Sequence, residues 1–396
     1  MGMTRLKKIL FRVVSVIIVT ILLLGFSERH FLKRYLSYTG DPLTVPLSWY
    51  DPIEKVTGQK DDDLQIASGN ILTIKKTALD RASAFAKAES ALSLMVIHRG
   101  IIQHEEYWEN EDRSVRFNPQ SMSKTILAML TGIAISEGHI GSVDDEIGKY
   151  ISEWKEDHRG KITIRQALQM SAGIEQMANS LDVSIFNRAV RHHFGTKFDE
   201  MALELKQVDP PGTKYEYNNE VTNILGIVLE RATRMRYAEY LSSRIWKPLG
   251  LDDASMYLDR EGGSVMKSCC ILSRPYDWAK LGFLFLNEGK YKGKKIVPSE
   301  WMKEMIIPSP NSDYYGYQIW LGSSYIPLKP MSLIYDKDDN PPLYLADDMI
   351  TFAGFGGQRV WISPKNELII VYATKKWSNA WDEAKVPNII LQSLQS

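Results

Sequence analysis

The sequence is poor in cysteine: among 396 residues there are only two, Cys269 and Cys270, and they are neighbours. Adjacent cysteines are badly placed for an unstrained disulfide, so we expect two small buried thiols and no disulfide framework. The fold must then be stabilised by burial of apolar side chains, for which a hydrophobic content of 44% is sufficient. A cysteine-dependent enzyme is not indicated, because no base for a reactive thiol can be identified.

Charge imbalance is also absent. Basic and acidic residues are equal at 48 each, and no basic segment is interleaved with aromatic residues, so nucleic acid is not an expected partner. Metal and cofactor motifs are missing too. His192-His193 lacks the Glu-x-x-His spacing of zinc hydrolases, and no EF-hand pattern follows Asp61–Asp63. Since there is no glycine-rich phosphate loop either, we expect no metal and no organic cofactor.

The N-terminus differs in kind from the rest of the chain. Basic residues, among them Arg5 and Lys8, precede Val13–Phe26, a run of apolar or small residues. Its length lies between a secretory h-region and a membrane span, and the basic residues favour a cytoplasmic N-terminus. We therefore expect residues 1–27 to be a membrane anchor or signal segment, whose cleavage stays open. The catalytic part would lie outside the cytoplasm, in the periplasm or at the cell surface.

The remaining chain divides into an irregular part and one large domain. Residues 28–76 bear proline and aspartate with little periodicity, and we interpret them as a linker with irregular wrapping. In residues 77–396, strand patterns at Leu92–Trp108 and Gln358–Thr374 predict two hairpins. Helical periodicity dominates about 120–291. We expect an α/β (α+β) fold, in which an antiparallel sheet from the N- and C-terminal parts is flanked by helices and a mostly helical subdomain is inserted.

A polar loop that runs into an apolar helix carries the main chemical hypothesis. Ser121 and Lys124 stand at the helix entry, three residues apart, so both side chains leave one face. A buried lysine in this arrangement can act as base for a serine nucleophile. The same spacing recurs at Ser152–Lys155 and Ser264–Lys267, but neither opens an apolar helix. A capping serine followed by a surface lysine would also explain the tetrapeptide, so the rest of the chain must decide.

A tyrosine loop could complete the site. Tyr217 follows Pro210-Pro211-Gly212 and precedes a strongly periodic helix. A hydroxyl held there could relay a proton between the serine and the leaving group, and Asn219 could donate hydrogen bonds to a substrate carbonyl. A half-buried aromatic beside capping asparagines is the competing interpretation.

A glycine-rich stretch that opens a strand supplies the last element. Glycine at a strand edge lets the backbone approach a ligand closely. The N–H groups of Ser121 and Phe355 would then form an oxyanion hole, although a plain β-turn remains an alternative. The residues expected to contact substrate in this stretch are Gly354, Phe355, Gly357 and Gln358.

Taken together, these segments resemble the serine β-lactamase-like hydrolases, the superfamily of class C β-lactamases and penicillin-binding enzymes. Within it, the likeness is closest to the 6-aminohexanoate-dimer hydrolase and esterase branch. It runs from about Leu92 to Thr374, with Ser121–Lys124 as the first motif and Tyr217–Asn219 as the Tyr-x-Asn motif. Sequence segments without a catalytic role, such as Trp246–Leu251, follow in the order found in the family. The resemblance implies a β-lactamase/transpeptidase-like fold and an acyl-enzyme, with Ser121 as nucleophile, Lys124 as base and Tyr217 as proton relay.

The third family motif, Lys-Thr-Gly or His-x-Gly, is where this sequence departs from the family. Counting back from Trp361–Pro364 places Phe352-Ala353-Gly354 there, and Phe352 cannot supply the positive charge that helps β-lactamases hold a substrate carboxylate. We therefore expect a small neutral amide, ester or peptide-like substrate. The alternatives are a β-lactamase or D-alanyl-D-alanine carboxypeptidase with the same machinery, and a non-catalytic binding protein of the cell envelope. The oligomeric state is not predicted.

Overall fold

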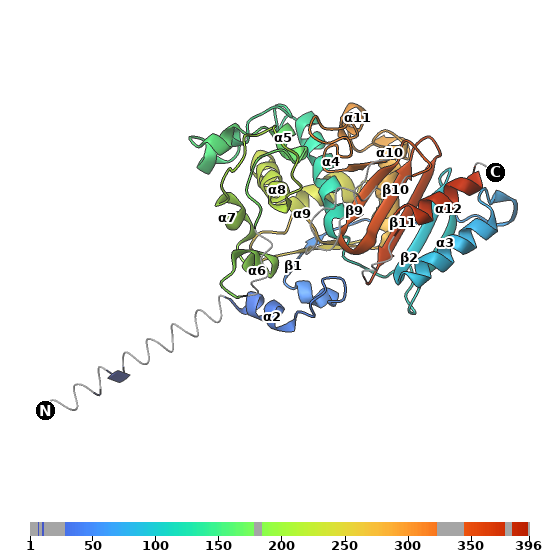
Figure 1. Ribbon diagram of the computed structural model, residues 1–396, viewed down its shortest axis with the longest axis horizontal. Coiled ribbons are helices and arrows are strands. Elements are labelled where there is room, and N and C mark those ends of the chain that lie inside the picture. Colours follow the sequence, from blue (N-terminus) through green and yellow to red (C-terminus); the bar gives the residue numbers. More distant parts are fainter. Residues whose placement is uncertain are drawn as a thin grey trace.

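The computed structural model of the protein describes residues 28–177, 184–322, 344–376 and 382–394, together with residues 7, 10 and 11. In this part of the chain, a six-stranded sheet lies beside a group of helices (Figure 1). The predicted anchor, Val13–Phe26, lies outside the described residues. Among the residues that are described, no helix has the length and apolar content needed to span a membrane.

The main sheet joins the two ends of the large domain. Its strands are antiparallel neighbours in the order β3-β2-β11-β10-β9-β8. Both predicted hairpins are confirmed, and pairing between β2 and β11, with Leu94 opposite Tyr372, fuses them into one sheet. The predicted fold class is thus confirmed. The strands are β2 (Ala91–His98), β3 (Ile101–Tyr107), β8 (Trp320–Leu321), β9 (Ile350–Gly354), β10 (Gln358–Ser363) and β11 (Leu368–Thr374).

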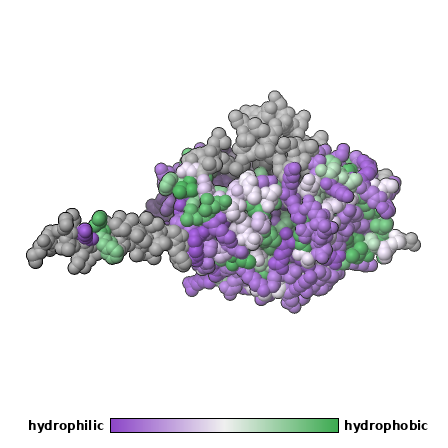
Figure 2. Space-filling model, turned by 90° about the horizontal axis from the view of Figure 1, so that it is seen from below, coloured by the Kyte–Doolittle hydropathy of each residue, from purple (hydrophilic) through white to green (hydrophobic). Residues whose placement is uncertain are grey.

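Helices cover both faces of this sheet. Every residue of β11, the β-prone run Leu-Ile-Ile-Val-Tyr-Ala-Thr, is buried, which requires cover on both sides. On one side α3 (Lys76–Ala88) and α12 (Lys385–Leu394) pack side by side (Figure 1). On the other lies α10 (Pro275–Leu286), whose Gly282 approaches Ile369 of β11. The exterior seen in Figure 2 is mostly hydrophilic, with apolar groups scattered over it.

The helical subdomain is built around α4 (Ser123–Ser136). Its residues from Ser123 to Ala134 are all buried, so it is a core helix, and the indole of Trp301 lies over its Gly132. A capping box formed by Thr163 and Gln166 stands at the start of α5. The other helices are α5 (Ile164–Leu168), α6 (Arg188–His193), α7 (Phe198–Leu203), α8 (Asn219–Thr233), α9 (Tyr237–Leu241) and α11 (Ser299–Met305).

Residues 28–76 are not the irregular linker that their composition indicated. They contain α2 (Arg29–Ser37) and β1 (Ile53–Val56), and β1 pairs with β4 (Ala254–Tyr257), which in turn pairs with β5 (Ile271–Leu272). Phe31 and Trp49 are buried against a second apolar cluster formed with residues far along the chain. The elements are too short for periodicity to reveal them, and distant partners stabilise them.

A single arginine fastens this N-terminal segment to the body. Arg34 of α2 is fully buried and donates to five backbone carbonyls. Burial lowers its pKa from the ordinary value. Further along, Asp62 pairs with Arg274, the residue before α10, and Asp63 pairs with Lys280 within α10. The carbonyl acceptors of Arg34 belong to Tyr50, Asp51, Phe194, Leu258 and Asp259.

The prediction of two free thiols is wrong, because Cys269 and Cys270 are joined by a disulfide. In extended backbone, consecutive side chains point to opposite sides. Here Cys270 has a φ of +73°, in the left-handed region, which turns the two Cβ atoms to the same side. The argument from neighbouring positions assumed ordinary backbone, and this local turn removes that assumption.

Candidate active site

The entry to α4 presents Ser121. A 3₁₀ turn, Gln120–Met122, leads into the helix, so Ser121 lies at the helix entry, as expected from the sequence. Gln120 has a positive φ of +53°, and its N–H donates to the side-chain oxygen of Asn118 at 2.8 Å. The side-chain nitrogen of Asn118 donates to the Tyr50 hydroxyl at 2.7 Å. The turn before Ser121 is therefore supported from the N-terminal segment.

Lys124 is buried beside Ser121. Its side chain is 1% exposed, and its Nζ lies 2.9 Å from Ser121 Oγ and 2.8 Å from the carbonyl oxygen of Ser268. Burial lowers the pKa of Lys124 from 10.5 to about 7, and the negative charge of Glu220 opposes part of that lowering. A lysine with this pKa is available in its neutral form near pH 7, so it can accept a proton from the serine hydroxyl.

Glu220 is a buried carboxylate that the sequence interpretation did not single out. It accepts a hydrogen bond from Asn223 Nδ2 at 2.9 Å and lies 3.2 Å from His192 Nε2. The side-chain oxygen of Asn223 accepts from the N–H of Ser268 at 3.0 Å. Because the carbonyl of Ser268 contacts Lys124, a continuous polar network connects the carboxylate to the lysine. The spacing within α8 contains no signal for this network, which depends on the loop at Ser268.

Tyr217 reaches the site from the turn before α8. Its ring centroid is 5.1 Å from Lys124 Nζ, so residues 93 positions apart in the sequence are brought together. Trp320 stacks on the ring at 5.6 Å, and Tyr315 meets it edge-on at 6.1 Å. An aromatic wall is thus formed on this side of the serine, and it holds the tyrosine ring in place.

The two asparagines after Tyr217 have different surroundings. Asn218 caps α8: its side-chain oxygen accepts from the N–H of Glu220, and its nitrogen donates to the carbonyl of Ile174. Asn219 is the first residue of α8 and is exposed. The capping role that the sequence left open therefore belongs to Asn218, and the proposed contact of Asn219 with substrate stays a prediction.

The glycine-rich stretch lies against the serine turn. A Cβ on Gly354 would come within 2.2 Å of the Pro119 carbonyl oxygen, so only glycine fits where β9 passes this turn. Phe355–Gly357 forms the next turn, half-exposed at Phe355 and buried at Gly357. The oxyanion-hole role of Phe355 stays a prediction. A substrate contact by the Gln358 side chain is not supported, because its amide bonds the backbone of Thr374 in both directions.

Phe352, at the first position of the third motif, has an apolar side chain and apolar surroundings. Phe352 is fully buried and packs edge-on against Trp278 and Phe285 of α10. The nearest cation along the chain, Arg359, donates to the carbonyl of Gly354 but is paired with the buried carboxylate of Glu383. Nothing on β9 therefore replaces the positive charge that the motif lacks.

The other two Ser-x-x-Lys matches have different surroundings. Ser152 begins a 3₁₀ turn and is exposed, as is Lys155. Lys267 is buried, but its Nζ pairs with Asp199 at 2.6 Å and Glu230 at 3.1 Å. These carboxylates raise the pKa of Lys267 against the effect of burial, so it remains a cation. Only Lys124 combines burial with a serine partner among the three.

Comparison with known proteins places this geometry in a family context. Residues 80–395 match the family model described as Beta-lactamase. Protein flp of Staphylococcus aureus (strain MRSA252) is 26% identical over 174 residues, which are 41% of this chain and 34% of flp. The 6-aminohexanoate-dimer hydrolase of Paenarthrobacter ureafaciens is 25% identical over 196 residues, 47% of this chain and 49% of that protein. The chain thus spans about a third to a half of the length of these curated relatives.

Solved structures share the fold over most of the chain. The structure named "Putative 6-aminohexanoate-dimer hydrolase from Bacillus anthracis" has a TM-score of 0.70 at 21% identity, covering 91% of this chain and 93% of that one. FmtA from Staphylococcus aureus has a TM-score of 0.59 at 15% identity, covering 88% and 95%. At these identities the likeness is one of fold.

Proposed function

The chain belongs to the β-lactamase family, and from this premise we propose that it is a serine hydrolase acting through an acyl-enzyme on Ser121. The observation that carries the proposal is the 2.9 Å contact between Ser121 Oγ and the buried Nζ of Lys124. A neutral amine at hydrogen-bond distance can remove the hydroxyl proton as the oxygen attacks a carbonyl carbon.

The proposed reaction has two stages. In the first, Ser121 Oγ bonds to the substrate carbonyl, Lys124 takes the proton, and the N–H groups of Ser121 and Phe355 stabilise the oxyanion. The bond between the carbonyl carbon and the leaving nitrogen or oxygen then breaks. The amine or alcohol leaves with the proton from Lys124, relayed through Tyr217. In the second stage a water molecule attacks the acyl ester, and the serine recovers its proton as the acid departs.

The proposed substrate is a small neutral amide, ester or peptide-like molecule. Phe352 is buried among aromatic side chains, so β9 offers no cation to hold a substrate carboxylate. The name of one relative, 6-aminohexanoate-dimer hydrolase, supports an amide. A β-lactamase or carboxypeptidase is the alternative, and turnover of a chromogenic cephalosporin at ordinary enzyme rates would contradict the argument from Phe352.

We also propose that residues 1–27 tether the catalytic part outside the cytoplasm, on the sequence pattern alone. N-terminal sequencing of the protein from the membrane fraction tests this. A chain that starts near Glu28 would contradict the tether.

The activity is tested by intact-mass analysis of the full chain after treatment with a fluorophosphonate probe, beside Ser121→Ala. We expect one adduct on the parent protein and none on the variant. An adduct on both would mean that another serine reacts. If neither folded protein were labelled, the non-catalytic envelope protein would become the better explanation.

A further inference from the structure

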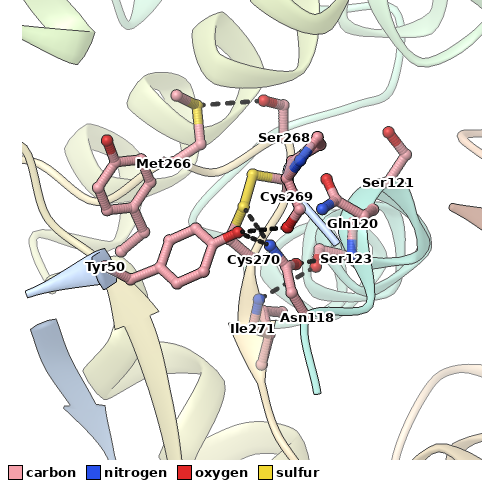
Figure 3. The surroundings of a disulfide bond; sticks show 12 residues. Tyr50, Asn118, Gln120, Ser121, Ser123, Met266, Ser268, Cys269, Cys270 and Ile271 are labelled. Carbon is pink, nitrogen blue, oxygen red and sulfur yellow. Dashed lines mark hydrogen bonds between the residues drawn. A yellow bond between two sulfur atoms is a disulfide. The ribbon is translucent and has the colours of Figure 1, made fainter. Parts of the chain in front are cut away.

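The disulfide lies directly against the entry to α4 (Figure 3). On one side of it, the carbonyl of Ser268 accepts from Lys124 Nζ at 2.8 Å. On the other, the N–H of Ile271 donates to Ser123 Oγ at 3.3 Å. The four residues from Ser268 to Ile271 therefore contact the helix turn that carries Ser121 and Lys124 on both sides of the disulfide.

A third contact is made by the disulfide itself. Asn118 Nδ2 approaches Cys270 Sγ at 3.5 Å, and the same side chain holds the N–H of Gln120 through its oxygen. Cys270 is 3% exposed, whereas Cys269 is partly exposed. The Cys270 sulfur thus contacts the side chain that supports the serine turn, and Cys269 is the more exposed of the two cysteines.

We propose that the Cys269–Cys270 disulfide positions Lys124 for proton transfer from Ser121, and that its reversible reduction slows acylation of Ser121. The inference rests on the proposed function of these two residues. The disulfide closes a small ring that includes the peptide bond between the cysteines, and this ring fixes the backbone next to Ser268. Cys270 has a left-handed φ of +73°, a conformation that residues other than glycine rarely adopt. Breaking the disulfide removes the covalent constraint that holds this conformation.

The chemistry of reduction is ordinary thiol–disulfide exchange with a dithiol. A thiolate of the dithiol attacks Cys269 Sγ, the sulfur–sulfur bond breaks, and Cys270 leaves as a thiolate that takes up a proton. The second thiol of the reagent then attacks the mixed disulfide and releases Cys269. The protein gains two electrons and two protons, and the dithiol becomes a cyclic disulfide.

The expected effect follows from the contact that is lost. Lys124 donates to the Ser268 carbonyl, and this bond orients the amine toward Ser121. Loss of one hydrogen bond to a group that becomes charged during the reaction slows it by about 10-fold to 100-fold. The carbonyl also favours the protonated amine, so its loss moves the acid limb of the pH–rate profile to lower pH. The other ionisable groups facing Lys124 are Tyr217 and Glu220, and His192 lies behind Glu220.

The test measures the second-order rate constant for fluorophosphonate labelling of Ser121 in the full chain. It is measured before reduction with dithiothreitol, after reduction, and after reoxidation with diamide, with thiols counted by iodoacetamide mass shifts. We expect two thiols and a 10-fold to 100-fold slower rate after reduction, with recovery on reoxidation. The double variant Cys269→Ala/Cys270→Ala serves as control. It should be slow and should not respond to dithiothreitol, since the chain has no other cysteine.

Failure of the inference is distinguishable from failure of the proposed function. An unchanged labelling rate in protein with two counted thiols overturns the inference and leaves Ser121 as nucleophile. A response of the double variant to dithiothreitol overturns it as well, and so does a slower rate with an unmoved acid limb. Absence of labelling in the oxidised protein overturns the proposed function and this inference with it. Should the double variant fail to fold, the reduction and reoxidation of the parent protein decide alone.

Discussion

The pH dependence of Ser121 acylation offers the sharpest test of the site. Burial lowers the pKa of Lys124 from 10.5 to about 7, a lowering that corresponds to about 5 kcal/mol against the charged form. At pH 7 about half of the amines are therefore neutral, compared with fewer than about one in a thousand for an ordinary lysine. The active fraction, and with it the rate, should fall about tenfold at pH 6 and about a hundredfold at pH 5 relative to the alkaline plateau.

The matching perturbation is Glu220→Gln. The carboxylate favours the protonated lysine, so its removal should lower the midpoint of the acid limb by roughly one pH unit. Because a weaker base also accepts the serine proton less readily, the plateau rate should fall at the same time. A variant that is merely less stable would lose rate without any movement of the midpoint.

The assay is the rate constant for fluorophosphonate labelling between pH 5 and 9, with Ser121→Ala as the blank. His192→Gln is the control, because His192 lies 3.2 Å from Glu220 and an imidazole is the commonest general base in enzymes. If the acid limb disappeared in this control, the titrating base would be the histidine. A flat profile, or a midpoint near pH 10, would refute the assignment of Lys124 as a base whose pKa is lowered by burial.

Three further outcomes are expected. Lys124→Met should abolish labelling yet raise the melting temperature by a few degrees. Between about pH 7 and 10.5 the unfolded parent chain binds one more proton than the folded protein, because burial lowers the pKa of Lys124, so the stability of the parent rises with pH across that range. The variant should lose this rise. Gly354→Ala should slow labelling at least about tenfold, because its Cβ would overlap the Pro119 carbonyl; an unchanged rate would show that the turn moves freely. Arg34→Met should lower the unfolding free energy in denaturant titrations by about 2–4 kcal/mol, since five carbonyls lose a donor, and no loss would mean that water replaces it.

The strands and long helices could be predicted because their signals are local. The run Leu368–Thr374 is continuously apolar and β-branched, and α8 has a regular apolar period. The serine turn was also accessible, since a polar loop before an apolar helix marks an N-terminus. Fusion of the two hairpins into one sheet followed from the economy of burying both.

The remaining features depend on contacts between distant residues. Nothing in the sequence around Arg34 indicates that its carbonyl acceptors lie up to 225 positions away. Glu220 resembles an ordinary first-turn acid of a helix until the loop at Ser268 is placed beside it. The disulfide was missed for a similar reason, because its geometry depends on one left-handed residue, Cys270. Composition predicts none of these backbone and network details.

The attachment of Arg34 also has a consequence for the order in which the protein is made. Two of its acceptors, the carbonyls of Phe194 and Asp259, are 160 and 225 residues further along the chain. At 5–20 residues per second, the ribosome needs roughly 10–45 s to deliver the later one. The apolar side chains of α2 therefore stay exposed to solvent until these later residues have been synthesised. Strand β2 lacks one of its neighbours for longer still, because β11 is near the C-terminus. The growing chain is therefore expected to depend on chaperones until synthesis is almost complete.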